Sequence, residues 1–158
     1  MKKLLAILMT LCLLCAAFAA VADMEIPNWD DMPQVIIEDD DTEVDEAAFE
    51  GEWVLGTAFL ESEYISLSDL IDLIGFNTMP IVISEGKITQ DYQQENGEFI
   101  TLETTYTFES GQLQAEDTDG QNFVIEQLED GNIVISLFIP GEGETVKCIS
   151  LFMVHPEE

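Results

Sequence analysis

Basic residues are scarce in this sequence. Its 158 residues include four Lys and Arg against 33 Asp and Glu, and the formal net charge at pH 7 is −29. Nucleic acids and anionic membranes bind to basic surfaces, because these attract phosphate groups. We therefore expect no nucleic-acid partner and no binding to anionic membranes. Diffuse negative charge keeps a protein in solution, but it does not by itself indicate a cation site.

Histidine and cysteine are also rare. His155, three residues from the C-terminus, is the only histidine, and the cysteines are Cys12, Cys15 and Cys148. Structural zinc sites need a cluster of Cys and His ligands, and the sequence has none, so we expect no metal and no cofactor. Cys148 and His155 are seven positions apart, and an odd separation along one strand places two side chains on opposite faces. A Cys–His catalytic pair is therefore not expected.

Catalysis by paired carboxylates cannot be assigned to any particular residues. Glycoside hydrolases use two acids in this way, but 33 acids allow so many pairs that no single pair is informative. A Gly-rich phosphate-binding loop is absent as well. The sequence therefore predicts no catalytic residues, and a non-enzymatic protein is the favoured interpretation.

The first 22 residues have the layout of a secretory signal peptide. Residues 1–3 are positively charged, residues 4–15 are apolar, and residues 20–22 form an A-x-A cleavage site before the polar chain that begins at Asp23. A membrane anchor is the alternative, but the apolar run is shorter than the roughly 20 residues that span a bilayer. We therefore predict a secreted, extracellular protein of bacterial type, with no stable membrane insertion after cleavage. Cleavage would leave Cys148 as the only thiol, which excludes an intramolecular disulfide.

Residues 23–48 differ in composition from the rest of the chain. Pro27 and Pro33 interrupt regular structure, and residues 38–46 are almost all acidic. Such a stretch cannot bury itself, so we predict a largely disordered acidic segment. Its apolar side chains are nevertheless numerous enough to dock on a folded domain; they are Ile26, Trp29, Met32, Val35, Ile36 and Ile37.

The sequence of residues 49–155 predicts one all-β domain. Glycines in turn-forming pairs such as Asn-Gly and Asp-Gly recur at intervals of about ten residues, which is typical of a meander of hairpins. The segments between them alternate apolar and polar side chains. Eight strands are predicted, at Glu52–Leu60, Ile81–Ser84, Lys87–Gln93, Glu98–Glu109, Gln112–Thr118, Gln121–Leu128, Asn132–Ile139 and Thr145–Val154. Eight antiparallel strands favour an up-and-down barrel over a two-sheet sandwich, because closure removes the sheet edges.

One segment of the domain has helical rather than alternating periodicity. Leu67, Leu70, Ile71 and Ile74 recur at helical spacing, Ser66 or Ser68 can cap the first turn, and Gly75 can end the helix. We therefore predict one short helix after the first strand.

The last two strands are apolar on both faces and need cover on both. We expect the outer face of these two strands to be covered by another element. The candidates, in order of preference, are the predicted helix at 67–74, the segment Ile26–Ile37 and a second subunit.

The start of the domain resembles that of a known family. Gly51-Glu52-Trp53 looks like the Gly-x-Trp that opens the first strand of lipocalins and related calycins, and a helical insert and seven meandering strands follow. Residues 49–154 are thus similar to the lipocalin-like domains of small secreted bacterial proteins. The resemblance implies a barrel whose floor is closed by Trp53 and whose interior holds a small apolar ligand. The chain departs from typical lipocalins in having no helix after the last strand and no disulfide.

Aromatic side chains are the candidate ligand-binding residues. Small eight-stranded barrels are either filled by side chains or hold one small ligand. The residues expected to line the interior are Trp53, Phe59, Tyr106, Phe108, Phe123 and Phe138. Two functions stay open: a secreted module that binds a small apolar ligand or a protein partner, and a structural or protein-interaction domain with a filled core.

Overall fold

The computed structural model describes residues 27–36, 43–94, 97–116, 120–141 and 145–156. The predicted signal peptide and residues 37–42 of the acidic segment lie outside these ranges. The described chain contains two short 3-10 helices, one α-helix and nine strands. They are η1 (Trp29–Asp31), η2 (Glu46–Phe49), β1 (Gly51–Leu60), β2 (Glu63–Tyr64), α2 (Leu67–Ile74), β3 (Ile81–Ser84), β4 (Lys87–Gln93), β5 (Phe99–Glu109), β6 (Gln112–Glu116), β7 (Asn122–Gln127), β8 (Ile133–Pro140) and β9 (Val146–Val154).

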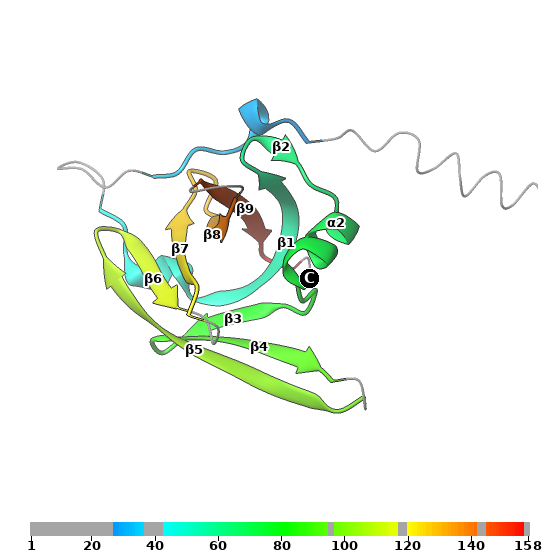
Figure 1. Ribbon diagram of the computed structural model, residues 1–158. Coiled ribbons are helices and arrows are strands. Elements are labelled where there is room, and N and C mark those ends of the chain that lie inside the picture. The colour runs from blue at the N-terminus through cyan, green and yellow to red at the C-terminus, as the bar shows by residue number, and fades with distance from the viewer. Residues whose placement is uncertain (1–26, 37–42, 95–96, 117–119, 142–144, 157–158) are drawn as a thin grey trace, which may run out of the picture.

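Eight of the strands close into an antiparallel barrel. The order of the strands is β2-β1-β3-β4-β5-β6-β7-β8-β9, and β1 also pairs with β9, so that only the two-residue strand β2 remains outside the ring (Figure 1). The first half of β1 pairs with β3 and the second half with β9. This arrangement confirms the predicted eight-stranded up-and-down barrel with one short helix after the first strand.

Tight turns explain why consecutive strands pair. Residues Glu85 and Gly86 between β3 and β4 have φ angles of 52° and 76°, and Ser110 and Gly111 between β5 and β6 have φ angles of 52° and 71°. Two successive positive φ angles are typical of the type I′ turn, whose twist matches that of a hairpin. The predicted turn glycines thus lie where the sheet reverses direction.

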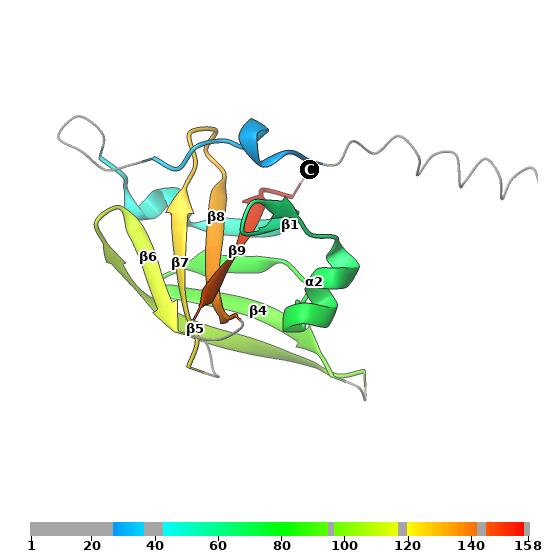
Figure 2. The ribbon, with the colours of Figure 1, turned by 45° about the horizontal axis from the view of Figure 1, so that its top comes forward.

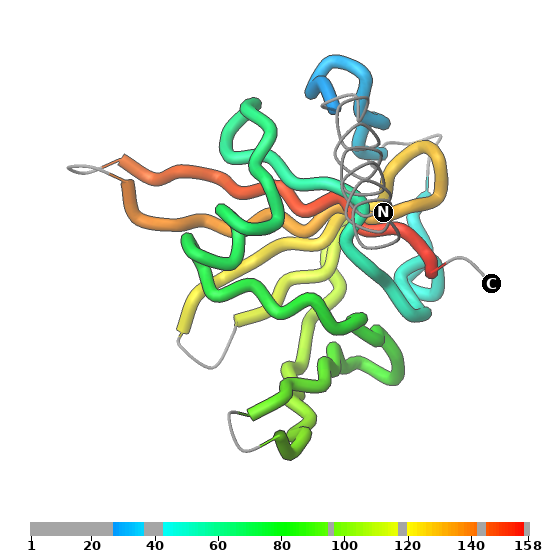
Figure 3. Tube along the Cα trace, turned by 90° about the vertical axis from the view of Figure 1, so that its right-hand side faces the viewer, coloured from blue at the N-terminus to red at the C-terminus, as the bar shows by residue number. Residues whose placement is uncertain are grey.

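Helix α2 has the predicted caps and lies at one end of the barrel. The Ser66 hydroxyl accepts a hydrogen bond from the Asp69 amide, and Gly75 ends the helix with a φ of 64°. Leu70 is fully buried in the barrel core. The helix lies at the same end as the turn between β8 and β9, whereas η2 and the C-terminus lie at the opposite end (Figures 2 and 3). We call these the open end and the closed end.

The closed end is filled by aromatic side chains. Phe49 from η2 and Trp53 from β1 have no exposed surface, and the Trp53 indole donates a hydrogen bond of 2.9 Å to the Phe49 carbonyl. The Phe49 ring meets the Phe108 ring edge-on at 6.2 Å. His155 stacks on Trp53 at 3.8 Å from outside, so this residue covers the barrel end and is not a free tail residue.

A β-bulge in β1 reverses which side chains point inward. The register of β1 against β9 shifts between Leu55 and Thr57. Before the bulge, Trp53 and Leu55 belong to the interior core; after it, Ala58 belongs to that core. Phe59 therefore lies in a second apolar cluster on the outer face, with Leu128, Val134 and Phe152. This placement corrects the expectation that Phe59 lines the interior, because simple alternation assumed a strand without a bulge.

The outer face of the last strands is covered by residues 27–36. Trp29 meets the rings of Phe59 and Phe152 edge-on at 5.3 and 5.8 Å, and Val35 forms a β-bridge with Leu128. In Figure 1 this blue segment runs along the outside of the barrel wall. The helix, expected first as the cover, instead packs at the open end, where Leu70 reaches the interior core.

These contacts also change the interpretation of residues 23–48. The Ile36 amide donates to the Gln127 carbonyl at 2.8 Å, and the Glu129 amide donates to the Gln34 carbonyl at 2.9 Å. Val44 is 4% exposed. The described parts of this segment therefore pack on the barrel: Gln34 and Ile36 through backbone hydrogen bonds beside β7, and Val44 in the interior core.

Candidate functional site

The barrel interior contains a cavity of about 230 Å³ between its two walls. One wall is formed by β3, β4 and β5, the other by β7, β8 and β9, and Phe76 after helix α2 completes the lining. The lining residues are Phe76, Ile81, Ile88, Gln90, Leu102, Thr104, Phe123, Ile135, Leu137, Leu151 and Met153. Most of the lining is apolar, which suits an apolar guest.

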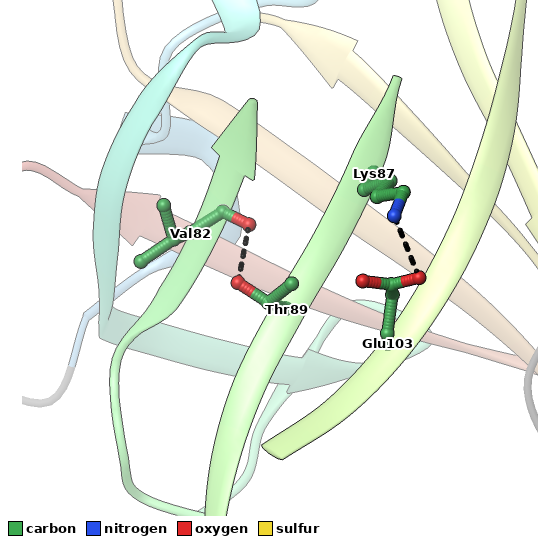
Figure 4. Close-up of polar contacts among 4 residues, drawn as sticks. All are labelled: Val82, Lys87, Thr89 and Glu103. Atoms are coloured by element: carbon green, nitrogen blue, oxygen red, sulfur yellow. Dashed lines mark hydrogen bonds and ion pairs between the residues drawn. The ribbon is translucent and has the colours of Figure 1, made fainter. Parts of the chain in front are cut away.

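Strand alternation explains why these residues face inward. On β4, Ile88 and Gln90 point into the barrel, whereas Lys87 and Thr89 point outward, where Thr89 donates to the Val82 carbonyl at 3.5 Å. Lys87 forms an ion pair of 2.9 Å with Glu103 on the same outer face (Figure 4). The positive charge of Lys87 is thus kept outside, and none of the described residues that line the cavity is charged.

Two polar side chains lie in the cavity wall. The Gln90 amide nitrogen donates to the carbonyls of Asn77 and Met79 at 3.2 and 2.6 Å, which ties the loop after α2 to β4. This fixes the Gln90 side chain and leaves its carbonyl oxygen as an acceptor. The Thr104 hydroxyl can donate or accept. The cavity can therefore offer hydrogen bonds to one polar group of a guest.

The cavity opens to solvent near Leu102. This side chain is 40% exposed although it lines the cavity. Further exposed apolar side chains surround the open end, on α2, on the β4–β5 hairpin and on the β8–β9 hairpin. They are Leu67, Ile71, Leu73, Tyr92, Phe99, Ile100, Phe138 and Val146. A molecule that enters the barrel thus passes an apolar rim.

The structure places the predicted lining residues at different locations. Phe123 lines the cavity. Trp53 and Phe108 pack at the closed end with Phe49, and Tyr106 packs against the same core. Phe59 lies on the outer face, as described above, and Phe138 is 45% exposed at the open end. The aromatic side chains were therefore a poor guide to the cavity, which is lined mainly by aliphatic ones.

Sequence reasoning did contain one correct signal for the cavity. Leu102, Thr104, Tyr106 and Phe108 alternate along β5 and share its inner face. The sequence did not indicate where along this face the interior is empty. That depends on the sizes of side chains from six different strands.

Tyr106 is held at the closed end by an acidic neighbour. Burial raises the pKa of its phenol above the ordinary value, and a hydrogen bond to the Glu46 carboxylate of η2 raises it further. The Tyr106 phenol on β5 thus interacts with Glu46 of η2. This contact fastens η2 over the barrel end, which is a structural role.

Other chemistry finds no support in the described part of the chain. Cys148 lies towards the open end, where its neighbours are Phe138 on β8 and Glu61 in the turn after β1, whereas His155 lies on Trp53 at the closed end. Among the residues that the structure describes, no group of three or more His, Cys, Asp and Glu could hold a metal ion. No helix within the described ranges is long and apolar enough to cross a membrane.

Comparison of the chain with protein-family models, with curated proteins and with solved structures found no match.

Proposed function

We propose that this protein is a secreted, non-enzymatic, lipocalin-like module that binds a small, uncharged, largely apolar molecule in its barrel. The observation that supports this most is the apolar cavity of about 230 Å³ that opens at Leu102. An apolar cavity of about 150 Å³ is enough to bind benzene. A guest with one or two rings, or a short alkyl chain, therefore matches the size of this cavity.

The electrostatics of the site favour a neutral guest. Among the residues that the structure describes, no cationic side chain lines the cavity to pair with a carboxylate or phosphate, and the net charge of −29 repels anions. The Gln90 carbonyl and the Thr104 hydroxyl suit a hydroxyl or an amide N–H on the guest. A free fatty acid, with its ionised headgroup, is a poor match.

Native mass spectrometry of residues 23–158, before and after extraction with organic solvent, tests this proposal. We expect a bound mass that disappears on extraction and that returns when the extract is added back. The variant Leu137→Trp fills the cavity and should prevent rebinding, whereas Val82→Trp places the same side chain at a 37% exposed position on β3 that does not line the cavity and should not. Rebinding by Leu137→Trp as strong as by the natural protein would contradict the proposal.

A protein-interaction domain is the second candidate. It is favoured by the exposed apolar side chains at the open end, of which Phe99 at 56% and Val146 at 64% are the most exposed. Such a patch is typical of interaction surfaces. If this function is correct, substitution of Phe99 and Val146 by Ser should abolish self-association or partner binding in size-exclusion chromatography with light scattering. The small-molecule proposal predicts no such change.

A further inference from the structure

A second hollow lies outside the barrel, beneath the N-terminal segment. It has a volume of about 250 Å³ and is separate from the interior cavity. Residues Trp29 to Val35 form its roof, and the outward-facing side chains of β7, β8 and β9 form its floor. We call it the outer chamber. Its floor consists of Glu126, Val134, Ser136, Ser150 and Phe152.

The floor of the outer chamber contains polar side chains, although the segment that covers it is largely apolar. Ser136 and Ser150 face each other across β8 and β9, and Ser150 is only 5% exposed. Within the described part of the chain, the Ser150 hydroxyl contacts only the Cys148 sulfur, at 3.8 Å, and sulfur is a weak partner. A buried hydroxyl of this kind normally has a stronger hydrogen-bond partner.

Of the described residues that line the chamber, Glu126 is the only charged one. No hydrogen bond or ion pair joins it to another residue of the described chain. Burial raises its pKa, with no opposing contribution from a nearby cation. A partly desolvated carboxylate without a partner is costly, and a cation placed beside it would offset that cost.

Aromatic rings complete the chamber. Trp29 in the roof and Phe152 in the floor meet edge-on at 5.8 Å, and both line the hollow. Aromatic faces attract organic cations, and quaternary ammonium groups are bound by aromatic side chains in this way. We infer that the outer chamber is a binding site for a small organic cation, with Glu126 as the counter-ion and with Trp29 and Phe152 contacting the alkyl groups.

The chemistry of the chamber discriminates between classes of ligand. Calcium takes six to eight oxygen ligands, which is more than the Glu126 carboxylate, the two serine hydroxyls and the Gln34 amide of the chamber supply. Anions are repelled by Glu126 and by the net charge of −29. That same charge raises the local concentration of cations. A volume of about 250 Å³ exceeds the roughly 150 Å³ that holds benzene, and so it accommodates an ammonium ion with several methyl groups.

Choline is a suitable probe because it has a neutral analogue of the same shape, 3,3-dimethylbutan-1-ol. We would titrate each into ¹⁵N-labelled protein, residues 23–158, at constant ionic strength and follow the two tryptophan indole N–H signals by NMR. Trp29 lines the chamber, whereas Trp53 lies at the closed end and serves as a control within the same spectrum. We expect a saturable shift of the Trp29 signal with choline, a negligible shift with the alcohol, and no shift of Trp53.

Variants identify the group that holds the cation. Glu126→Gln keeps the shape and removes the charge, and we expect it to bind choline about tenfold more weakly, since a charge-assisted contact is lost. Glu116→Gln on the neighbouring strand β6 makes the same change outside the chamber and should bind normally. An unchanged Trp53 signal shows that each variant is folded. Equal shifts for choline and the alcohol, a shift that never saturates, or unchanged binding by Glu126→Gln would each overturn the inference.

Discussion

Thr57 offers a direct test of how the bulge in β1 is packed. It follows the bulge and lies opposite Phe152 on β9. Its hydroxyl oxygen is buried and has no hydrogen-bond partner in the described chain. Leaving a buried polar atom without a partner costs about 1–3 kcal/mol. Valine has nearly the same shape as threonine and lacks the hydroxyl, so Thr57→Val removes the cost without creating a cavity.

We therefore expect Thr57→Val to raise the free energy of unfolding by about 1 kcal/mol, at the low end of this range because a neighbouring water can relieve part of the cost. For a domain of this size that corresponds to an increase in Tm of about 3 to 5 °C. Urea denaturation and thermal melting both measure it. Thr57→Ser keeps the hydroxyl and deletes the methyl group, and it should lower the stability.

Thr107→Val is the matched control, because Thr107 is exposed on β5 opposite Gln114. A substitution at such a surface position normally changes the stability by less than about 0.5 kcal/mol. If Thr57→Val left the stability unchanged or lowered it, the Thr57 hydroxyl would have to be hydrogen-bonded in solution, and the account of an unpaired group after the bulge would be wrong.

Three further predictions concern the segment, the helix and the carboxylate described above. Trp29→Ala removes two edge-to-face contacts, each worth about 0.5–1.5 kcal/mol. Urea denaturation should therefore show that the free energy of unfolding falls by about 2 kcal/mol. An unchanged denaturation midpoint would mean that residues 27–36 do not pack on the barrel. Gly75→Ala forces an alanine into φ 64° with no atom within 4 Å of its Cβ, so backbone strain alone should cost about 1 kcal/mol, and Gly75→Asn should cost less. The raised pKa of Glu126 means that the folded protein holds this proton more tightly than the unfolded chain does. The free energy of unfolding therefore decreases as the pH rises from the ordinary glutamate pKa through the raised one. Glu126→Gln should therefore be stabilising relative to the natural protein at pH 7 and less so at pH 4, and an identical difference at both pH values would refute the assignment.

The strand order could be predicted because it depends on local signals. The glycines at 86, 111 and 131 have positive φ angles, and the alternation between them gives the inner face of each strand. Ser66 and Gly75 likewise predicted the ends of α2. Each of these features is encoded within a few neighbouring residues, and an up-and-down order needs no further information.

The parts that could not be predicted depend on contacts between distant residues. Phe59 reached the outer face because of the bulge at Gly56, and a glycine inside a strand was the only signal for it. The close approach of Val154 and of the Phe152 carbonyl, at 3.2 and 3.3 Å from a Cβ at this position, explains why a glycine suits it. Phe76, which lines the cavity, comes from a loop with no periodic pattern.

The covering of β8 and β9 shows the same limit. Their two apolar faces correctly indicated that something lies outside them. The helix was expected first as the cover, yet its fully buried residue, Leu70, packs in the interior core at the open end. Trp29 and Val35 carry the outer cover, and nothing in their local sequence specifies which strands they meet.

Closure of the ring by its first and last strands determines the order of events during synthesis. Val54 pairs with Val154, and at about 5–20 residues per second the ribosome needs about 5–20 s to make the chain between them. Throughout that interval the hairpins from β3 to β8 can form, but the nascent sheet keeps two open edges. Residues 27–36, the earliest described part of the chain to be made, find Phe152 only when synthesis is almost finished.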